Sequence, residues 1–291
     1  DYGWLKLASA QQLKRRIRSV DNTAKITKAM SMIAASKMTR AQQMALQGRP
    51  YAERMMGLLS DLAAQPQFED DPHPLLTARD INKIGVIVIT PDRGLTGGLN
   101  TAVNRFAAQH ILQSGNEAEV VAVGKKARDF FARTSHLKSV FTDIGDRPSL
   151  DVVIPIAKVM IDEYLEGNID AVYVIYSKYI NTTVQNPELI TILPVQPAEL
   201  ENKDKVGYIY EPDSNEVLNN LVPRYIEMEI YHSILESIAS EQSARMVAMR
   251  NATDNALEMK SDLTLEMNKV RQESITSELL DIVGGVAAVE A

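Results

Sequence analysis

The chain has 291 residues, of which 45% are apolar and 24% charged, a composition that excludes a wholly disordered protein. It contains no cysteine, so disulfide frameworks, thiolate zinc sites and cysteine nucleophiles are excluded as well. The formal net charge is −7, and no apolar run approaches the roughly 20 residues that span a bilayer, so we expect no direct membrane insertion.

The first predicted element is a long helix within residues 1–65. Residues 4–47 contain neither glycine nor proline, and apolar residues recur at steps of four, three and four, as a helix that packs along one seam requires. These seam residues are Leu13, Ile17, Val20 and Ala24. The spacing predicts a helix whose apolar side packs against a second helix.

The same segment is strongly basic. Residues 1–54 hold eleven Lys or Arg against three Asp or Glu, a balance of +8 that leaves −15 on the remainder. A basic beginning can be a transit peptide or a nucleic-acid-binding arm. Because this one is longer than a transit peptide and has a helical apolar pattern, we interpret it as folded structure. We expect it to meet an acidic protein surface, and we expect no nucleic-acid partner.

The middle of the chain, residues 80–200, alternates between strand-like and helix-like segments. The predicted strands are residues 84–90, 118–124, 137–144, 170–180 and 186–195, and the predicted helices are 100–114, 125–134 and 149–167. Strands that alternate with helices are typical of βαβ units around a largely parallel sheet. We therefore predict a Rossmann-like α/β domain inserted between two long helices.

The turn TPDRGLTGGLN, residues 90–100, follows the first of these strands. A phosphate-binding P-loop ends in Lys and Ser or Thr, but Leu99 and Asn100 follow the glycines here, and the dinucleotide pattern G-x-G-x-x-G is also unmatched. A tight strand-to-helix connection is the favoured interpretation, and an anion-binding turn remains the alternative. Arg93, next to Asp92, is suited to meet a carboxylate on a partner surface or is simply solvated.

Catalytic and metal sites find little support in the sequence. The four histidines, at positions 73, 110, 136 and 232, are scattered and form no metalloprotease or triad pattern. The acidic run at 69–71 precedes Pro-His-Pro and is typical of a loop. We therefore predict no catalytic residues, no cofactor and no bound metal.

The last predicted element is a helix within residues 212–291. Residues 224–283 contain no glycine or proline, and such a helix would be roughly 90 Å long. Its stretch at 240–255 has no Leu or Ile, which suits either a shaft that turns inside another protein or a weakly packed exposed helix. Because the inserted domain returns the chain, this helix and the first one can form a long antiparallel coiled coil.

Several stretches resemble the gamma subunits of F-type ATP synthases. They are KITKAMSMIAASKM at 25–38, TPDRGLTGGLN at 90–100, SEQSARMVAMRNATDNA at 240–256 and NKVRQESITSELLDIVGGVAAV at 268–289. The resemblance covers nearly the whole chain. It implies a terminal coiled coil with a Rossmann-like domain, and a glycine turn that binds no nucleotide.

This resemblance also implies a function and partners. The chain would be a non-catalytic central rotor that couples a proton-driven ring to ATP synthesis or hydrolysis in the catalytic head. Its partners would be the alpha and beta subunits, an epsilon-type subunit (delta in mitochondria) and the membrane c-ring. It would be peripheral on the energy-coupling membrane, either on the matrix side of the mitochondrial inner membrane or on the cytoplasmic side of a bacterial plasma membrane.

Residue roles follow from the matching positions. The group that would hydrogen-bond a beta-subunit loop near the top of the shaft comprises Arg271, Gln272, Thr276 and Glu278. The basic residues that would face acidic beta-subunit segments lower down are Arg93, Lys25, Lys28 and Lys37. The coupling-sensitive pair across the coil would be Met30 with Arg245 and Met246, and the foot on the ring and the epsilon-type subunit would include Tyr208, Tyr210 and Glu211.

Two other classes of protein stay open at the level of the sequence. A Rossmann-like nucleotide-binding enzyme with helical extensions would bind ATP or NAD, although the phosphate motifs are missing. A coiled-coil scaffold that does not rotate would lack the stoichiometry of one copy to three alpha and three beta subunits.

Overall fold

The computed structural model describes residues 10–63, 73–134, 136–197, 211 and 213–290. Helix α1 (Ala10–Ala63) begins this part of the chain and helix α6 (Ser214–Glu290) ends it. The chain divides into two compact units, one of residues 34–245 and one that joins residues 10–33 with 246–290. The domain bounds predicted from the sequence remain predictions, since these units divide both long helices.

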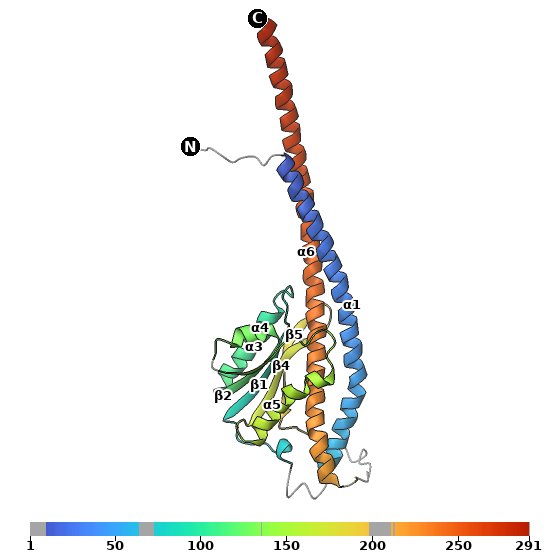
Figure 1. Ribbon diagram of the computed structural model, residues 1–291, viewed down its shortest axis with the longest axis vertical. Coiled ribbons are helices and arrows are strands. Elements are labelled where there is room, and N and C mark those ends of the chain that lie inside the picture. Colours follow the sequence, from blue (N-terminus) through green and yellow to red (C-terminus); the bar gives the residue numbers. More distant parts are fainter. Residues whose placement is uncertain (1–9, 64–72, 135, 198–210, 212, 291) are drawn as a thin grey trace. The chain divides into compact units, whose positions relative to one another are not determined.

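The larger unit contains a five-stranded sheet in the order β3-β2-β1-β4-β5. Its strands are β1 (Lys83–Ile89), β2 (Glu117–Val123), β3 (Leu137–Phe141), β4 (Ala171–Tyr179) and β5 (Gln185–Leu193). The strands β1 to β4 are all parallel to one another, and β5 pairs antiparallel with β4. The predicted α/β fold is confirmed, with a mostly parallel sheet (Figure 1).

Both faces of the sheet are covered, because successive residues of the central strands point to opposite sides. Val86 and Val88 pack with α3 (Leu99–Ser114) and α4 (Lys125–Phe131) on one face. Ile87 and Ile89 belong to the core on the other face, which α5 (Ile154–Leu165) and the first part of α6 complete. A helical layer therefore lies on each side of the sheet (Figure 1).

The start of one helix and the direction of the last strand both have local reasons. The helix predicted at 149–167 begins as a short 3₁₀ turn, Leu150–Val152, and becomes α-helical only at Ile154. Pro155 stands in the first turn of that α-helix, where its missing N–H costs nothing. The strand β5 returns antiparallel because only residues 180–184 connect it to β4, which is too short for a crossover.

Part of the stretch without Leu or Ile belongs to the interface between α6 and the sheet. Ser240 Oγ donates to the Ser177 carbonyl at 2.7 Å, and Ser243 Oγ donates to the Thr182 carbonyl at 2.8 Å. Both serines are buried. The small side chains therefore allow close approach of α6 to the end of β4, so residues 240–243 do not belong to a weakly packed exposed helix, one of the two predicted alternatives.

The smaller unit is an antiparallel pair of helical segments. Ser31 Oγ donates to the Met246 carbonyl at 3.1 Å, and Thr27 and Thr253 share a hydroxyl contact of 2.7 Å. Further along, Lys260 donates to Asp21. The partners on α6 rise in steps of seven as the numbers on α1 fall. This antiparallel, heptad-spaced contact confirms the predicted coiled coil of the terminal helices.

Candidate functional site

The glycine turn after β1 is held by the chain's own backbone groups. The Asp92 carboxylate accepts hydrogen bonds from the N–H groups of Lys125 and Asp143, each at 2.9 Å. The Thr90 hydroxyl accepts from the Ala127 N–H at 2.7 Å. These two polar side chains are therefore used to fix the turn, while Arg93 beside them is exposed.

Helix α6 covers this edge of the sheet, where open α/β folds place their ligands. Ser237, Ile238 and Glu241 of α6 line the space left beside Thr90 and Gly124, and its volume is about 40 Å³. Ligand pockets usually measure roughly 300–1,000 Å³. This edge therefore has no room for a nucleotide, because the chain's own helix lies in the usual position of the ligand.

A charged network joins both long helices to the sheet domain. Lys37 of α1 pairs with Asp146 at 2.6 Å, and the Gln242 side chain of α6 donates to the same carboxylate at 3.1 Å. On the next turn Arg245 pairs with Glu241 at 2.6 Å and donates to the Gly94 carbonyl at 3.3 Å. Lys37 is therefore paired within this unit, and Arg245 contacts α6 and the glycine turn.

Burial raises the pKa of the Glu241 carboxyl above its usual value. The Arg245 guanidinium opposes this rise, and the negative charges of Asp146 and Asp92 add to it. The side chains of Arg245 and Glu241 are only 11% and 14% exposed, so the pair is largely removed from water. The network is consequently sensitive to the loss of either partner.

The seam of the smaller unit is built from small and hydroxylated side chains. Ala24, Thr27, Thr253 and Ala256 are all buried there, and each threonine also donates to a carbonyl one turn back in its own helix. Side chains of this size let two helices approach closely without deep interdigitation. Met30 is half-buried and precedes Ser31, whose hydroxyl donates to the Met246 carbonyl; the predicted coupling role of Met30 with Arg245 and Met246 stays a prediction.

A three-membered charge cluster borders this seam. Asp21 pairs with Lys25 and with Lys260, both at 2.7 Å, so it connects α1 to α6. Hydrogen bonds from Lys25 and Lys260 lower the pKa of Asp21 to about 2 from its usual 3.8. Sequence reasoning missed this role of Asp21, because its partner is 239 residues away.

Replacing Asp21 by asparagine should lower the thermal midpoint of the helical pair at pH 7 by a small amount. The lowered pKa means that the cluster stabilises the fold above about pH 4 and loses this effect as the pH falls toward 2. The midpoints of Asp21→Asn and the parent chain should converge over that interval when followed by circular dichroism. Asp262→Asn, an exposed change on α6, serves as the control. A difference that persists at pH 2 would contradict the assignment.

The far part of α6 carries the predicted group for the beta-subunit loop. Every residue from Arg271 to Leu280 is exposed, and within the group the Thr276 hydroxyl donates to the Gln272 carbonyl at 2.9 Å. At 100° per residue, Gln272 and Thr276 share one face of the helix, and Arg271 and Glu278 share another. The apolar residues on this segment are also exposed, between 51% and 66% for Ile275, Leu279, Leu280 and Ile282.

The remaining predicted residues lie in different places. Lys25 and Lys28 are exposed on α1, the former paired with Asp21. Glu211 is exposed, whereas Tyr208 and Tyr210 lie outside the described residues. In the described part of the chain, no helix is long and apolar enough to cross a membrane, and no cluster of His, Asp or Glu could hold a metal ion.

Comparisons with known proteins agree with this architecture. A family profile described as ATP synthase matches residues 9–289. The ATP synthase gamma chain of Dehalococcoides mccartyi is 51% identical over 97% of this chain and 100% of its own length, and that of Chloroflexus aurantiacus is 45% identical over 97% and 99%.

Two solved structures have a similar fold. The central stalk and c-ring structure of the Tetrahymena thermophila mitochondrial ATP synthase matches with a TM-score of 0.62 and 25% identity, over 78% of this chain and 99% of the matched chain. A Euglena gracilis mitochondrial ATP synthase structure matches with a TM-score of 0.66 and 18% identity, over 96% and 94%. With its antiparallel helical pair and its sheet domain, the chain therefore belongs to the ATP synthase gamma-chain family, which forms the central stalk of the F-type complex.

Proposed function

We propose that this chain is the rotating shaft of an F-type ATP synthase and carries no catalytic residues of its own. The observation that supports this most directly is the end of α6, where ten consecutive residues, 271–280, are exposed on every side of the helix. Large apolar side chains are rarely displayed in this way unless a partner covers them. A ring of alpha and beta subunits around this segment would provide that cover.

In this proposal the shaft transmits free energy without bond chemistry. A ring driven by protons turns the foot of the shaft, and the upper helix meets each beta subunit at a different angle. Each angle stabilises a different conformation of a catalytic site, so rotation and nucleotide affinity are linked by differential contacts. The chain would therefore be peripheral on the energy-coupling membrane, with the c-ring and an epsilon-type subunit at its foot near Glu211.

The basic side chains supply a second set of contacts. Arg93, Lys25 and Lys28 are exposed, and in this proposal they meet acidic segments of the beta subunits, for which Lys25 would have to share or leave Asp21. Lys37 already pairs with Asp146, so a beta-subunit carboxylate would have to share or replace that partner. The Met246 carbonyl accepts from Ser31 at the seam, and in this proposal coupling is sensitive to Met30 and Met246.

Gln272→Ala or Thr276→Ala should weaken coupling in the assembled complex. Each change removes side-chain hydrogen bonds to the beta-subunit loop, so ATP-driven proton pumping per ATP hydrolysed should fall roughly twofold to tenfold. Ser274→Ala is the matched control, because Ser274 is exposed on the opposite side of the same turn. Unchanged pumping in both variants would contradict the role of this group.

Stoichiometry provides the test of the whole proposal. A tagged chain that is expressed together with the other subunits of the complex should co-purify as one copy with three alpha and three beta subunits. A scaffold that does not rotate would not require this ratio. An enzyme of the Rossmann type would instead bind ATP or NAD as the isolated chain, which the space of about 40 Å³ at the sheet edge argues against.

A further inference from the structure

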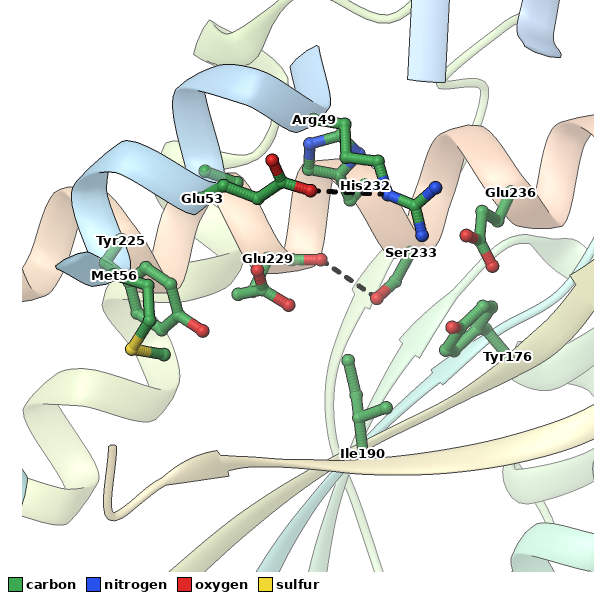
Figure 2. A pocket seen from close by; sticks show the side chains of 11 residues that line it. Arg49, Glu53, Met56, Tyr176, Ile190, Tyr225, Glu229, His232, Ser233 and Glu236 are labelled. Carbon is green, nitrogen blue, oxygen red and sulfur yellow. Dashed lines mark hydrogen bonds and ion pairs between the residues drawn. The ribbon is translucent and has the colours of Figure 1, made fainter. Parts of the chain in front are cut away.

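The larger unit contains a second cavity, far larger than the space at the sheet edge. Its volume is about 400 Å³, and it lies between α1 near Arg49, α6 near His232 and the strands β4 and β5 (Figure 2). Tyr176 and Ile190 line it from the strands. The proposed contacts with the alpha and beta subunits involve none of these side chains.

The charges of this cavity are unbalanced. Glu229 and Glu236 of α6 both line it, and no lysine or arginine in the described part of the chain forms an ion pair with either. Arg49 lies at the cavity, but it pairs with Glu53 at 3.9 Å, and both side chains are more than 70% exposed. The inner carboxylates therefore have no ion-pair partner among the described residues, although Lys178, which pairs with Glu188, also acts on Glu236 electrostatically.

Each carboxylate has a tyrosine hydroxyl as a partner, Tyr225 for Glu229 and Tyr176 for Glu236, but two polar atoms at the cavity have none. The Oε2 atom of Glu236 and the Nε2 atom of His232 are buried and make no hydrogen bond. Burial raises the pKa of Glu229, although His232 and the Tyr225 hydroxyl partly oppose the rise. Buried polar groups without partners are costly. A ligand that donates hydrogen bonds and carries positive charge would complement the two carboxylates.

The spacing of the two carboxylates restricts the ligand further. Glu229 and Glu236 are seven residues apart on one helix, so they share a face and their backbones are separated by roughly 10 Å along the axis. This separation is too wide for one metal ion, and no three potential ligands gather around one point in the described residues. Two cationic groups on one flexible molecule fit both carboxylates.

The other walls suit an alkyl chain with ammonium ends. Ile190 and Met56 supply apolar surface, and the rings of Tyr176 and Tyr225 can attract a cation. Burial raises the pKa of both tyrosines, so their hydroxyls stay protonated and neutral. A phosphate-bearing ligand would be repelled by the carboxylates.

We propose that this cavity binds a linear aliphatic diamine, with one ammonium group on Glu229 and the other on Glu236. A chain of about four to six carbons, with a hydrogen bond of roughly 2.8 Å at each end, bridges the two carboxylates. The site lies in the larger unit, and diamine binding there does not depend on the proposed rotation of the shaft.

Calorimetric titration of the full chain with cadaverine tests the proposal. Cadaverine should bind at least about tenfold more tightly than pentylamine, because only the diamine forms both charge-assisted contacts. Glu229→Gln and Glu236→Gln should each reduce cadaverine binding to the level of pentylamine. Glu227→Gln is the matched control on the same helix, because Glu227 pairs with Arg224 and does not line the cavity.

Folding of the variants is followed by thermal melting without ligand. Because Gln removes an unpaired buried charge and keeps the shape, both cavity variants should melt at or above the midpoint of the parent chain. The proposal is overturned if cadaverine, pentylamine and magnesium chloride at matched ionic strength behave alike, or if Glu227→Gln loses binding as much as the cavity variants. The proposal is also overturned if the isolated chain binds cadaverine but the assembled ATP synthase does not, because the cavity would then be covered by another subunit.

Discussion

Replacing Gly124 by alanine is expected to destabilise the larger unit by about 3–5 kcal/mol, close to the upper end for a single change. Gly124 has φ of 97° and ψ of 150°, a conformation that residues with a side chain rarely adopt. A Cβ atom at this position would also collide with the Thr90 carbonyl oxygen. The turn between β2 and α4 therefore has to shift. This shift would disturb the hydrogen bond from the Thr90 N–H to the Val123 carbonyl and the one from the Ala127 N–H to the Thr90 hydroxyl.

The thermal midpoint measures this effect, and a fall of about 10 °C is expected for a unit of this size. Gly145→Ala separates backbone strain from collision, because Gly145 has φ of 80° but a Cβ atom added there would meet no other atom within 4 Å. This control should cost only about 1–2 kcal/mol. Equal losses at the two glycines would show that the close approach to Thr90 is unimportant.

Arg245→Ala should give the second large effect, again about 3–5 kcal/mol. The change leaves Glu241 with most of its side chain buried and without its cation, beside the negative charges of Asp92 and Asp146. Urea unfolding of the full chain measures the loss. Arg250→Ala is the matched control, because that arginine is exposed on the same helix.

The pH dependence identifies the cause. A raised pKa means that the folded state holds the proton of Glu241 more tightly than the unfolded state, whose value is near 4.5. The ionised carboxylate therefore destabilises the fold at pH 7, and the penalty shrinks as the pH falls toward 4.5. The deficit of Arg245→Ala should follow this course, and Glu241→Gln in the same chain should remove most of it at pH 7. A deficit independent of pH would point to lost packing of the arginine stem instead.

The polar contacts around Arg245 and Asp146 bear on how torque would pass through the larger unit. Lys37, Gln242 and Arg245 connect both long helices to loops of the sheet domain through Asp146 and Gly94. Residues 34–63 of α1 and 214–245 of α6 thus belong to the same compact unit as the sheet. In the proposed rotor, this unit would accept torque as one body, because its polar links and its core would have to break together.

Periodicity was enough to predict most of the fold. The apolar steps at Leu13, Ile17 and Val20 and the glycine-free run at 224–283 predicted the terminal helices, because a 3.6-residue period directly reflects one buried face. The alternation of strand-like and helix-like segments over residues 80–200 predicted βαβ units around a largely parallel sheet, which the structure has. The missing phosphate motifs at 94–100 likewise predicted that the glycine turn is a connection.

The contacts that complete the site could not be predicted in this way. The spacing of Asp21 and Lys25 permits a pair along one helix, but nothing local identifies Lys260 as the second partner of Asp21 or shows that Ser240 faces Ser177. The roles proposed for Gln272 and Thr276 rest on resemblance alone, since an exposed polar pair on a helix has no physical signature until a partner covers it.

The sequence by itself determined which segments are helices and strands, that the terminal helices can pair, and to which family the chain is similar, because these depend on spacing and motifs along the chain. Only the tertiary structure decided that α6 fills the sheet edge where a nucleotide would sit, that Arg245 is paired with Glu241, and that two carboxylates on α6 line a cavity with no ion-pair partner among the described residues. The reason is that burial and charge balance depend on which distant segments come together, and that information is absent from any local pattern.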